Sequence, residues 1–445
     1  MAKHTTLEER KLMIRLANQG LSKRQIAQQI GRSPYTVRKW CRRYREHGED
    51  GLRSSMGRPR KGTLSTFPVS LRQALLMLRR IHPGWGPLSL LAALREDPQW
   101  KDKRLPSRSQ IALFLKEQGL TKPRRPHAAP PSAPKVTVTH PHMEWEMDAQ
   151  VNIHIPGLGR ASIINIVDVF TSIHVAALLC PNTRKPDAAC YRQVCRMAFS
   201  EFGLPEQISL DHDTIFLSGS PSPFPSDFLL WLHSITVKVR LITAPPPKEH
   251  ARVEGRHALV DAQALEGRPF KCWEDVQRAL DAQRRFTNAV YPVPKLGYKS
   301  RLEAFPSARH SGRQYSLLHE KALLDLEKAK TYLAKGKWYR QSNAKGQCRL
   351  GGRVYGLGKA WAGRRVEITY SPEKNAFKFT WQDQTTYKPA TWLTKETLMA
   401  KETPPKIRLA QQLPLPFTPS FKVSSYTTLV GYDFSGQARG TRLPD

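Results

Sequence analysis

The segment EWEMDAQVNIHI, residues 144–155, constrains the fold of this chain more than any other stretch. Its apolar residues Trp145, Met147 and Ile153 alternate with polar ones, which is typical of a β-strand with one buried face. The sequence PGLG at 156–159 supplies a hairpin turn, and two further apolar, β-branched runs follow it. We therefore expect three antiparallel strands at the start of one sheet.

The sequence beyond these strands predicts the rest of an α/β layer. A helix is expected at 186–202, short strands at 207–210 and 236–242, and a final helix after them. Carboxylates at the ends of adjacent strands, joined by one from a packed helix, repel one another unless divalent cations lie between them. The residues that fit this pattern are Asp148, Asp211 and Glu254.

The net charge predicts a polyanionic partner. Lys and Arg number 71 against 37 Asp and Glu, a balance of +34, and residues 1–125 alone hold 28 basic and 9 acidic residues. Nucleic acid is the partner that this excess favours, and we expect no membrane association because no run of about 18 apolar residues occurs. The six cysteines lack CxxC spacing, which argues against a disulfide framework and a structural zinc site.

The N-terminal region predicts a helix-turn-helix domain at residues 1–55. Ser22 opens a short helix with a capping box, and Ser33 with Pro34 opens a basic helix after a tight turn. Such a pair places its second helix in the major groove of DNA, although a basic hairpin that merely packs is the alternative. The candidate DNA-binding residues on that helix are Arg38, Lys39, Arg42 and Arg43.

A second helix-turn-helix domain is expected at residues 67–121. Its last helix opens with another capping box at Ser107, and Arg108 is its candidate DNA contact. The linker before it, residues 56–66, is basic and suits a minor groove, although a solvated tether is equally consistent. The candidate contacts in this linker are Arg58, Arg60 and Lys61.

The last third of the chain predicts three segments after a Pro-rich linker at 122–141. They are a connecting helix at 311–336, a small basic β-barrel at 337–386 and a flexible tail at 387–445. The barrel suits non-specific DNA contact. In the tail, the sequence QLPLPF from Gln412 to Phe417 is similar to peptides that dock into the bacterial sliding clamp, and a chance Pro-rich stretch is the alternative.

Three sequence blocks resemble the signature blocks of the DDE transposases and retroviral-type integrases. They are WEMD at 145–148, ISLDHDTIF at 208–216 and PKEHARVEGRH at 247–257. The tandem helix-turn-helix ends are similar to those of bacterial insertion-sequence members, and the C-terminal block resembles the small β-barrel of the phage Mu transposase group. The resemblance implies a multidomain α+β protein with a ribonuclease H-like α/β catalytic core at 142–310.

The resemblance also implies a chemistry. Asp148, Asp211 and Glu254 would be catalytic and would hold two Mg²⁺ ions, for which Mn²⁺ can substitute. The protein would bind the ends of a mobile element, cleave their 3′ ends and join them to target DNA. Because two ends must be joined, the expected form is a homo-multimer on double-stranded DNA in the bacterial cytoplasm, associated with the nucleoid.

The second block departs from the family pattern, which usually has Asp-Asn-Gly where this chain has Asp-His-Asp. Asp213 therefore competes with Asp211. We favour Asp211 because it directly follows the apolar strand and because Phe216 stands five positions on. The separation of 43 residues from Asp211 to Glu254 is wider than the family norm, and we place the excess in a surface loop at 218–225.

The third block holds a second candidate, Glu249, but the phrase Ala-Arg-Val-Glu matches the family at Glu254. Its basic residues Lys248, Arg252 and Arg256 would meet DNA phosphates, and ordinary surface charge is the alternative.

Two other functions remain open at this stage. One is a catalytically inactive DNA-binding regulator derived from a transposase. The other, a ribonuclease H-like enzyme that cuts RNA in hybrids, leaves the helix-turn-helix units unexplained.

Overall fold

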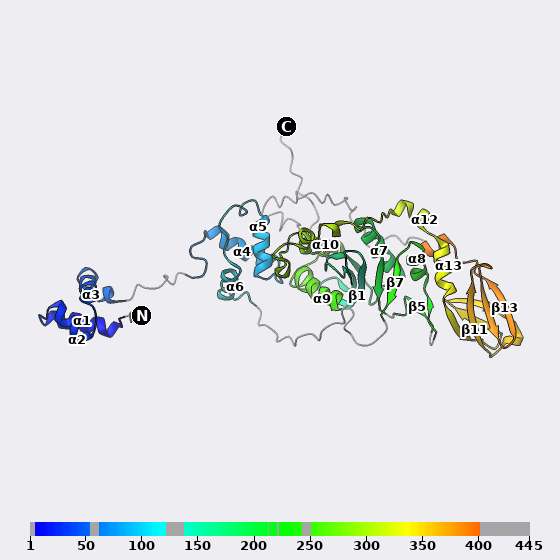
Figure 1. The fold of residues 1–445 in the computed structure, drawn as a ribbon, viewed down its shortest axis with the longest axis horizontal. Coiled ribbons are helices and arrows are strands. Elements are labelled where there is room, and N and C mark those ends of the chain that lie inside the picture. The colour runs from blue at the N-terminus through cyan, green and yellow to red at the C-terminus, as the bar shows by residue number, and fades with distance from the viewer. Residues whose placement is uncertain are drawn as a thin grey trace, which may run out of the picture. The chain divides into compact units, whose positions relative to one another are not determined.

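The computed structural model describes residues 5–53, 62–121, 138–211, 213–219, 222–242 and 251–400 (Figure 1). The chain divides into two compact units, residues 1–65 and residues 66–445. Within the described ranges, no helix has both the length and the apolar character needed to span a membrane.

The first unit is a three-helix domain made of α1 (Leu7–Asn18), α2 (Lys23–Ile30) and α3 (Pro34–His47). The side chain of Ser22 caps α2 and that of Ser33 caps α3, as the sequence predicts. Gly31 ends α2 in the left-handed conformation at φ 67°, which favours glycine. The apolar faces of all three helices form one buried core, and the first helix-turn-helix prediction is confirmed.

The second unit begins with α4 (Val69–Ile81), α5 (Pro87–Glu96) and α6 (Arg108–Glu117). The predicted capping box opens α6, where the Ser107 amide donates to Gln110 at 2.8 Å and the Gln110 amide donates back at 3.2 Å. The connection between α5 and α6 covers residues 97–107, whereas residues 31–33 suffice between α2 and α3. The second set therefore lacks the tight turn of the first.

The loop that joins α4 to α5 packs tightly on the α/β core. The ring of Trp85 stacks on Phe286 with 4.5 Å between centroids, and His82 stacks on the other face of the indole at 3.8 Å. A Cβ atom at Gly84 would lie 1.3 Å from the carbonyl oxygen of Ala262, so only glycine fits there. This contact explains why α4 to α6 belong to the same compact unit as the core.

The core holds a five-stranded sheet with the order β3-β2-β1-β4-β7. Strand β2 is antiparallel to β1 and β3, whereas β4 is parallel to both β1 and β7. This strand order, with a helix after β3, after β4 and after β7, confirms the predicted ribonuclease H-like α/β core. The strands are β1 (Glu144–Ile155), β2 (Gly159–Asp168), β3 (His174–Pro181), β4 (Gln207–Leu210) and β7 (Lys238–Leu241).

Helices cover both faces of this sheet (Figure 1). Trp145 and Met147 of β1 pack with Cys195 and Phe199 on one face, and Ile163 of β2 packs with α10 on the other. Up to the bulge between Gln150 and Ile153, the alternation of β1 therefore sends its odd-numbered side chains toward α7 and its even-numbered ones toward α9. The helices are α7 (Ala188–Phe202), α8 (Asp227–Ser234), α9 (Ala251–Val260), which continues into a π-helical turn at Asp261–Leu265, α10 (Trp273–Ala289) and α11 (Arg301–Ala304).

The predicted connecting helix at 311–336 is instead two helices, α12 (Glu320–Leu323) and α13 (Leu326–Ala334). The break occurs because the Asp325 carboxylate accepts the amide of Glu327 at 3.0 Å and so starts a new helix. Glu320 is fully buried and accepts hydrogen bonds from Arg196, Trp231 and Tyr315.

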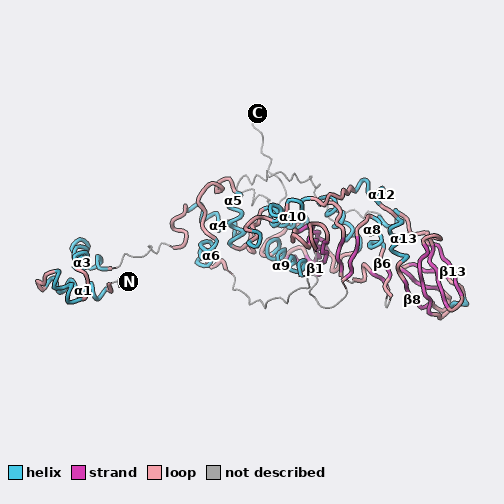
Figure 2. The backbone as a smooth tube through the Cα atoms, viewed as in Figure 1, coloured by secondary structure: helices cyan, strands magenta, loops and turns pink. Residues whose placement is uncertain are grey.

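The described part of the C-terminal domain consists mainly of strands (Figure 2), and four of its six strands match the short alternating runs of the sequence at 348–350, 353–357, 364–370 and 376–381. A four-stranded sheet has the order β13-β12-β11-β8, and β9 pairs with β10 in a hairpin whose Tyr355 contacts Phe377 and Phe379 of the sheet. Two sheets that share a core are compatible with the expected small barrel. The strands are β8 (Lys337–Gln341), β9 (Gln347–Leu350), β10 (Arg353–Gly356), β11 (Arg365–Ser371), β12 (Ala376–Trp381) and β13 (Gln384–Pro389).

Residues 387–400, expected to begin the flexible tail, form the end of β13 and the helix α14 (Lys395–Met399). Leu398 is fully buried, so the folded domain extends past the predicted limit at residue 386. The rest of the tail, including the Gln412–Phe417 segment proposed for clamp binding, lies outside the described residues. Short 3₁₀ turns lie at Gly48–Leu52, Pro294–Leu296, Pro306–Arg309, Leu317–His319 and Lys359–Trp361.

The segment 218–225, expected to be a surface loop, is anchored in the C-terminal domain. It contains the hairpin β5 (Leu217–Ser218) and β6 (Phe224–Pro225), and Phe224 is only 1% exposed. The Phe224 ring lies 4.8 Å from that of Trp338 and 5.8 Å from that of Phe377. Its apolar side chain fills the C-terminal core, a contact that the surrounding Ser and Pro residues concealed in the sequence.

Replacing this anchor should destabilise the protein. We expect Phe224→Ala to lower the free energy of unfolding by about 3–5 kcal/mol, because it leaves a cavity between the two aromatic rings. The measurement is urea unfolding of the full chain followed by circular dichroism. Val354→Ala, at a side chain that is 54% exposed, is the control and should change stability by less than about 0.5 kcal/mol. A loss below about 1 kcal/mol for Phe224→Ala would show that the hairpin is not anchored.

Candidate active site

The parallel pairing of β1 with β4 brings two of the predicted carboxylates to one level. Glu144 pairs with Gln207, and Glu146 pairs with Ser209. Two residues further along each chain, the same register places Asp148 beside Asp211, which directly follows β4. Neighbouring strands lie about 4.8 Å apart, so these two half-buried aspartates are neighbours at the carboxyl end of β4.

Helix α9 runs alongside β1, and side-chain contacts join every second residue of β1 to every fourth residue of the helix. The Glu146 carboxylate accepts the amide of Val253 at 3.2 Å, and the Gln150 amide donates to Asp261 at 2.7 Å. Between these contacts, His257 Nδ1 lies 4.0 Å from the Asp148 carboxylate. Two residues of a strand rise about 6.8 Å, and four residues of a helix rise about 6 Å. Because these two distances are similar, the strand and the helix stay in step over all three contacts.

Glu254 lies on the first turn of α9, three residues before His257, and it is exposed. Residues three apart on a helix are neighbours on its surface. Burial lowers the pKa of the His257 imidazole, while the negative charges of Asp148, Asp261 and Glu254 act in the opposite direction. The charges of Glu254 and Asp148 are thus both felt at this imidazole.

Tyr191 of α7 senses the same carboxylates from the other face of the sheet. Burial raises the pKa of its hydroxyl, and the negative charges of Asp211, Asp148 and Asp213 raise it further. Together, these two observations gather Asp148, Asp211 and Glu254, which we call the acidic edge, beside the middle of β1 at the carboxyl end of β4.

The donor set of the acidic edge suits a hard cation in its chemistry, because carboxylate oxygens are the ligands that Mg²⁺ and Mn²⁺ prefer. Within the described ranges, however, no three His, Cys, Asp or Glu side chains are close enough together to hold a metal ion. Asp148 is 28% exposed and Glu254 lies on the surface, so solvent reaches both carboxylates.

Asp213, the alternative to Asp211, forms an ion pair and hydrogen bonds within the turn that follows β4. Its carboxylate lies 2.8 Å from the Lys185 ammonium and accepts the amide of Ile215 at 2.9 Å. Its carbonyl oxygen accepts the amides of Phe216 and Leu217 at 3.0 and 3.1 Å. Because Asp213 closes the turn that follows β4, its interactions support Asp211 as the member of the acidic edge.

Arg256 does not lie where a DNA contact would place it, and that expectation needs correction. Its side chain is only 5% exposed, and Nη2 donates to the carbonyl oxygen of Ser172 at 2.7 Å. Burial lowers the pKa of Arg256 to about 9. Spaced three residues from Val253 on α9, it faces the protein interior and not a DNA surface.

The predicted DNA-binding residues of α3 and α6 are largely accessible. Arg38, Lys39, Arg42 and Arg108 are exposed, and the half-buried guanidinium of Arg43 lies 5.0 Å from the Trp40 ring centroid. Four predicted contacts, Arg58, Arg60, Lys61 and Lys248, lie outside the described residues, as does the side chain of Arg252.

Of the two residues found beside the acidic edge, the sequence offers His257, one helical turn after Glu254, as a further phosphate contact, and the structure places it beside Asp148. Tyr191 gave no signal, since only the packing of α7 on the sheet brings it near Asp211.

Comparison with known families finds matches in the N-terminal quarter of the chain. A helix-turn-helix domain model matches residues 9–61, and a homeodomain-like domain model matches residues 36–115. The chain therefore carries helix-turn-helix and homeodomain-like matches in tandem ahead of its α/β core, an arrangement consistent with the DDE transposase and integrase superfamily that its sequence blocks resemble.

Solved structures with some likeness to this chain are retroviral. The simian T-cell lymphotropic virus intasome in complex with PP2A regulatory subunit B56 gamma shares 13% identity, over 64% of this chain and 89% of the viral chain, at a TM-score of 0.32. The HTLV-2 integrase catalytic core domain in complex with magnesium shares 16% identity over 37% of this chain and 97% of its own, at 0.29. The catalytic core domain of BIV integrase shares 13% identity over 37% of this chain and 94% of its own, at a TM-score of 0.27. The fold assignment rests on strand order and not on these values.

The role of Asp213 can be tested through stability. At pH 7 we expect Asp213→Ala to lower the free energy of unfolding by about 1 kcal/mol, because the turn loses its ion pair and its cap. Although burial opposes the change, the Lys185 ammonium and the Ile215 amide hold the pKa of Asp213 below its usual value. The stabilisation is therefore present above about pH 4 and is lost as the pH falls through the lowered pKa.

The measurement is urea unfolding of both proteins at pH 7 and at pH 3. The difference between them should shrink at the lower pH. Glu327→Ala, which removes an acid that is 72% exposed, serves as the control and should change stability by less than about 0.5 kcal/mol at pH 7. An unchanged stability of Asp213→Ala at pH 7 would contradict the structural role of Asp213.

Proposed function

We propose that this protein is a DNA transposase that binds the ends of a mobile element, cleaves their 3′ ends and joins them to target DNA. The helix-turn-helix regions imply DNA binding, and the ribonuclease H-like core lies beyond them in the chain.

The observation that carries the proposal is the register of β1 with β4. It sets Asp148 level with Asp211 at the carboxyl end of β4, and the contact of His257 with Asp148 brings α9, which carries Glu254 one turn earlier, to the same part of β1. Repulsion between these carboxylates has no structural purpose of its own, so their gathering favours a cation-binding site.

Each element of the site has a part in this chemistry. Asp148, Asp211 and Glu254 would hold two Mg²⁺ ions, with Mn²⁺ as a substitute, and the ions would supply activation of a water or a 3′ hydroxyl and stabilisation of the departing oxygen. Helix α9 keeps Glu254 in place through the Glu146 and Gln150 contacts with its backbone and with Asp261. The exposed basic residues of α3 and the N-terminus of α6 would bind element-end DNA.

A homo-multimer on DNA follows from this proposal, because two element ends must be handled together. Because its proposed substrate is DNA, we place the protein with the bacterial nucleoid.

One observation favours a second function, a catalytically inactive DNA-binding regulator. The acidic edge does not bring three ligands into one coordination sphere in the described part of the chain. The sequence Asp-His-Asp at 211–213 also departs from the family pattern. The regulator would keep the helix-turn-helix regions and would lack the chemistry.

The two functions are separated by metal-dependent nicking. Purified protein is incubated with Mg²⁺, target DNA and labelled duplexes from the DNA that flanks its gene, and 3′ nicking and joined products are measured. We expect Asp148→Asn, Asp211→Asn and Glu254→Gln each to lower the nicking rate by two orders of magnitude or more, because each removes a metal ligand, on the order of several kcal/mol of transition-state stabilisation. Duplex binding without Mg²⁺ should change little.

Asp213→Asn is the matched control, since it makes the same change of charge two residues from Asp211 and keeps an acceptor for the Ile215 amide. Its nicking rate should stay within a few-fold of the wild type. Tight duplex binding with no nicking by the wild type, in Mg²⁺ or in Mn²⁺, would favour the regulator instead.

A further inference from the structure

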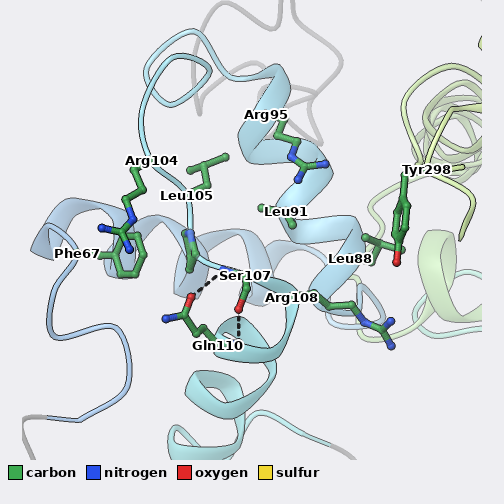
Figure 3. A pocket seen from close by; sticks show the side chains of 11 residues that line it. Phe67, Leu88, Leu91, Arg95, Arg104, Leu105, Ser107, Arg108, Gln110 and Tyr298 are labelled. Atoms are coloured by element: carbon green, nitrogen blue, oxygen red, sulfur yellow. Dashed lines mark hydrogen bonds between the residues drawn. The ribbon is translucent and has the colours of Figure 1, made fainter. Parts of the chain in front are cut away.

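A second candidate site lies in the second unit, away from the acidic edge. It is a cavity of about 700 Å³ between α5, the start of α6 and the loop at 293–299 of the core (Figure 3). Binding sites for small ligands usually measure about 300–1,000 Å³. We call this cavity the arginine pocket, after its three arginines Arg95, Arg104 and Arg108.

The charge of the arginine pocket selects an anion. Its lining includes three arginines and no acidic residue. Arg95 and Arg108 are exposed, and neither makes a hydrogen bond or ion pair with any residue in the described part of the chain. Both extend on the Tyr298 side of the pocket, whereas Arg104 lies over the Phe67 ring at 5.9 Å (Figure 3). Two guanidinium groups without a partner are thus available to a phosphate.

The start of α6 adds neutral donors to this charge. The capping box of Ser107 and Gln110 satisfies its own two amides and leaves the amide of Arg108 without an acceptor inside the helix. Such amides, with the positive end of the helix dipole, bind anions.

Tyr298 supplies an aromatic surface that the fold holds in place at a cost. Its φ of 62° lies in the left-handed region, which a tyrosine rarely adopts, and its side chain is 59% exposed. The bridge between Val293 and Lys299 closes the loop around it. Since neither backbone strain nor an exposed ring stabilises the fold, their coincidence beside a pocket indicates a ligand that stacks.

We propose that the arginine pocket binds one nucleotide of DNA that has left the base stack, with its base on Tyr298 and its phosphate on Arg95 and Arg108. A base inside a duplex shows no free face, so only an unpaired nucleotide fits a cavity with an aromatic wall. Aromatic residues beside basic ones are the usual surface for unpaired bases. Leu88 and Leu91 form an apolar part of the lining on which a base can rest.

This inference rests on the proposed function, in which strand cleavage at an element end makes neighbouring nucleotides easier to unstack. Its test needs no catalysis, because binding is measured in EDTA. Loss of nicking and loss of nucleotide binding can therefore be told apart in the same preparation.

The experiment uses the full chain and two labelled duplexes of one sequence, one fully paired and one with a single unpaired 2-aminopurine. Anisotropy gives the two dissociation constants, and 2-aminopurine emission reports stacking. We expect the unpaired duplex to bind about tenfold more tightly, with quenched emission, because one base stacks on an aromatic ring. Tyr298→Ala should remove both the tighter binding and the quenching, and it should leave the affinity for the paired duplex unchanged. Tyr298→Phe should retain the tighter binding and the quenching.

The charge is tested with a matched pair. Arg108→Gln should weaken binding of the unpaired duplex several-fold more than Arg80→Gln, which removes an exposed arginine of α4 that lies outside the pocket. Alanine at position 298 keeps part of the backbone strain. The unfolding midpoint of Tyr298→Ala is therefore measured beside that of the wild type, and an unchanged midpoint shows that the variant folds.

Three results would overturn the inference. They are equal affinity of the wild type for both duplexes, a preference that survives Tyr298→Ala, and displacement of the unpaired duplex by a free nucleoside monophosphate at equal concentration. The last result would assign the pocket to a free nucleotide. A preference that persists in a preparation without nicking activity would support the pocket and contradict the transposase.

Discussion

The pairing of β1 with β4 depends on one buried ion pair at the start of the strands. The Glu144 carboxylate is 5% exposed, lies 2.6 Å from the Arg240 guanidinium of β7 and accepts the hydroxyl of Ser209 on β4. One side chain thus ties three adjacent strands in a single register. A shift by one residue would bury Asp148 on the face of Trp145 and Met147 and leave Glu144 without its partner, which would be costly for a buried charge. The acidic edge follows from that register.

Two further contacts make the core part of a larger body. Phe224 joins the hairpin after Asp211 to the C-terminal domain. Trp85 joins the three helices α4, α5 and α6 to the core through its stacking on Phe286. The turn closed by Asp213 connects the first of these contacts to the end of β4, since the amide of Ser226 donates to the carbonyl of Phe216 at 2.8 Å. The segment after the second carboxylate is therefore held from both sides.

Much of this architecture could be predicted from local signals. The capping boxes at Ser22 and Ser107 fixed helix starts, and the alternation around Asp148 predicted β1 and its partners. Strand β13 was missed because its sequence QTTYKP lacks an apolar face, and β8 because Trp338 is its one buried residue. Phe224, Arg256 and Gly84 were misjudged or overlooked for a common reason. Their environments come from segments more than a hundred residues away, or from the opposite face of a helix, and no short-range pattern carries that information.

The proposed function requires that Asp148 and Asp211 bind the cation and that Asp213 does not. Anomalous diffraction from crystals of the full chain grown with Mn²⁺ separates these residues, because it locates the metal without an assay of activity. We expect manganese density in contact with the carboxylates of both Asp148 and Asp211, and its loss in Asp148→Asn. Density at Asp213 alone, or an acidic edge without manganese while other sites fill, would contradict it.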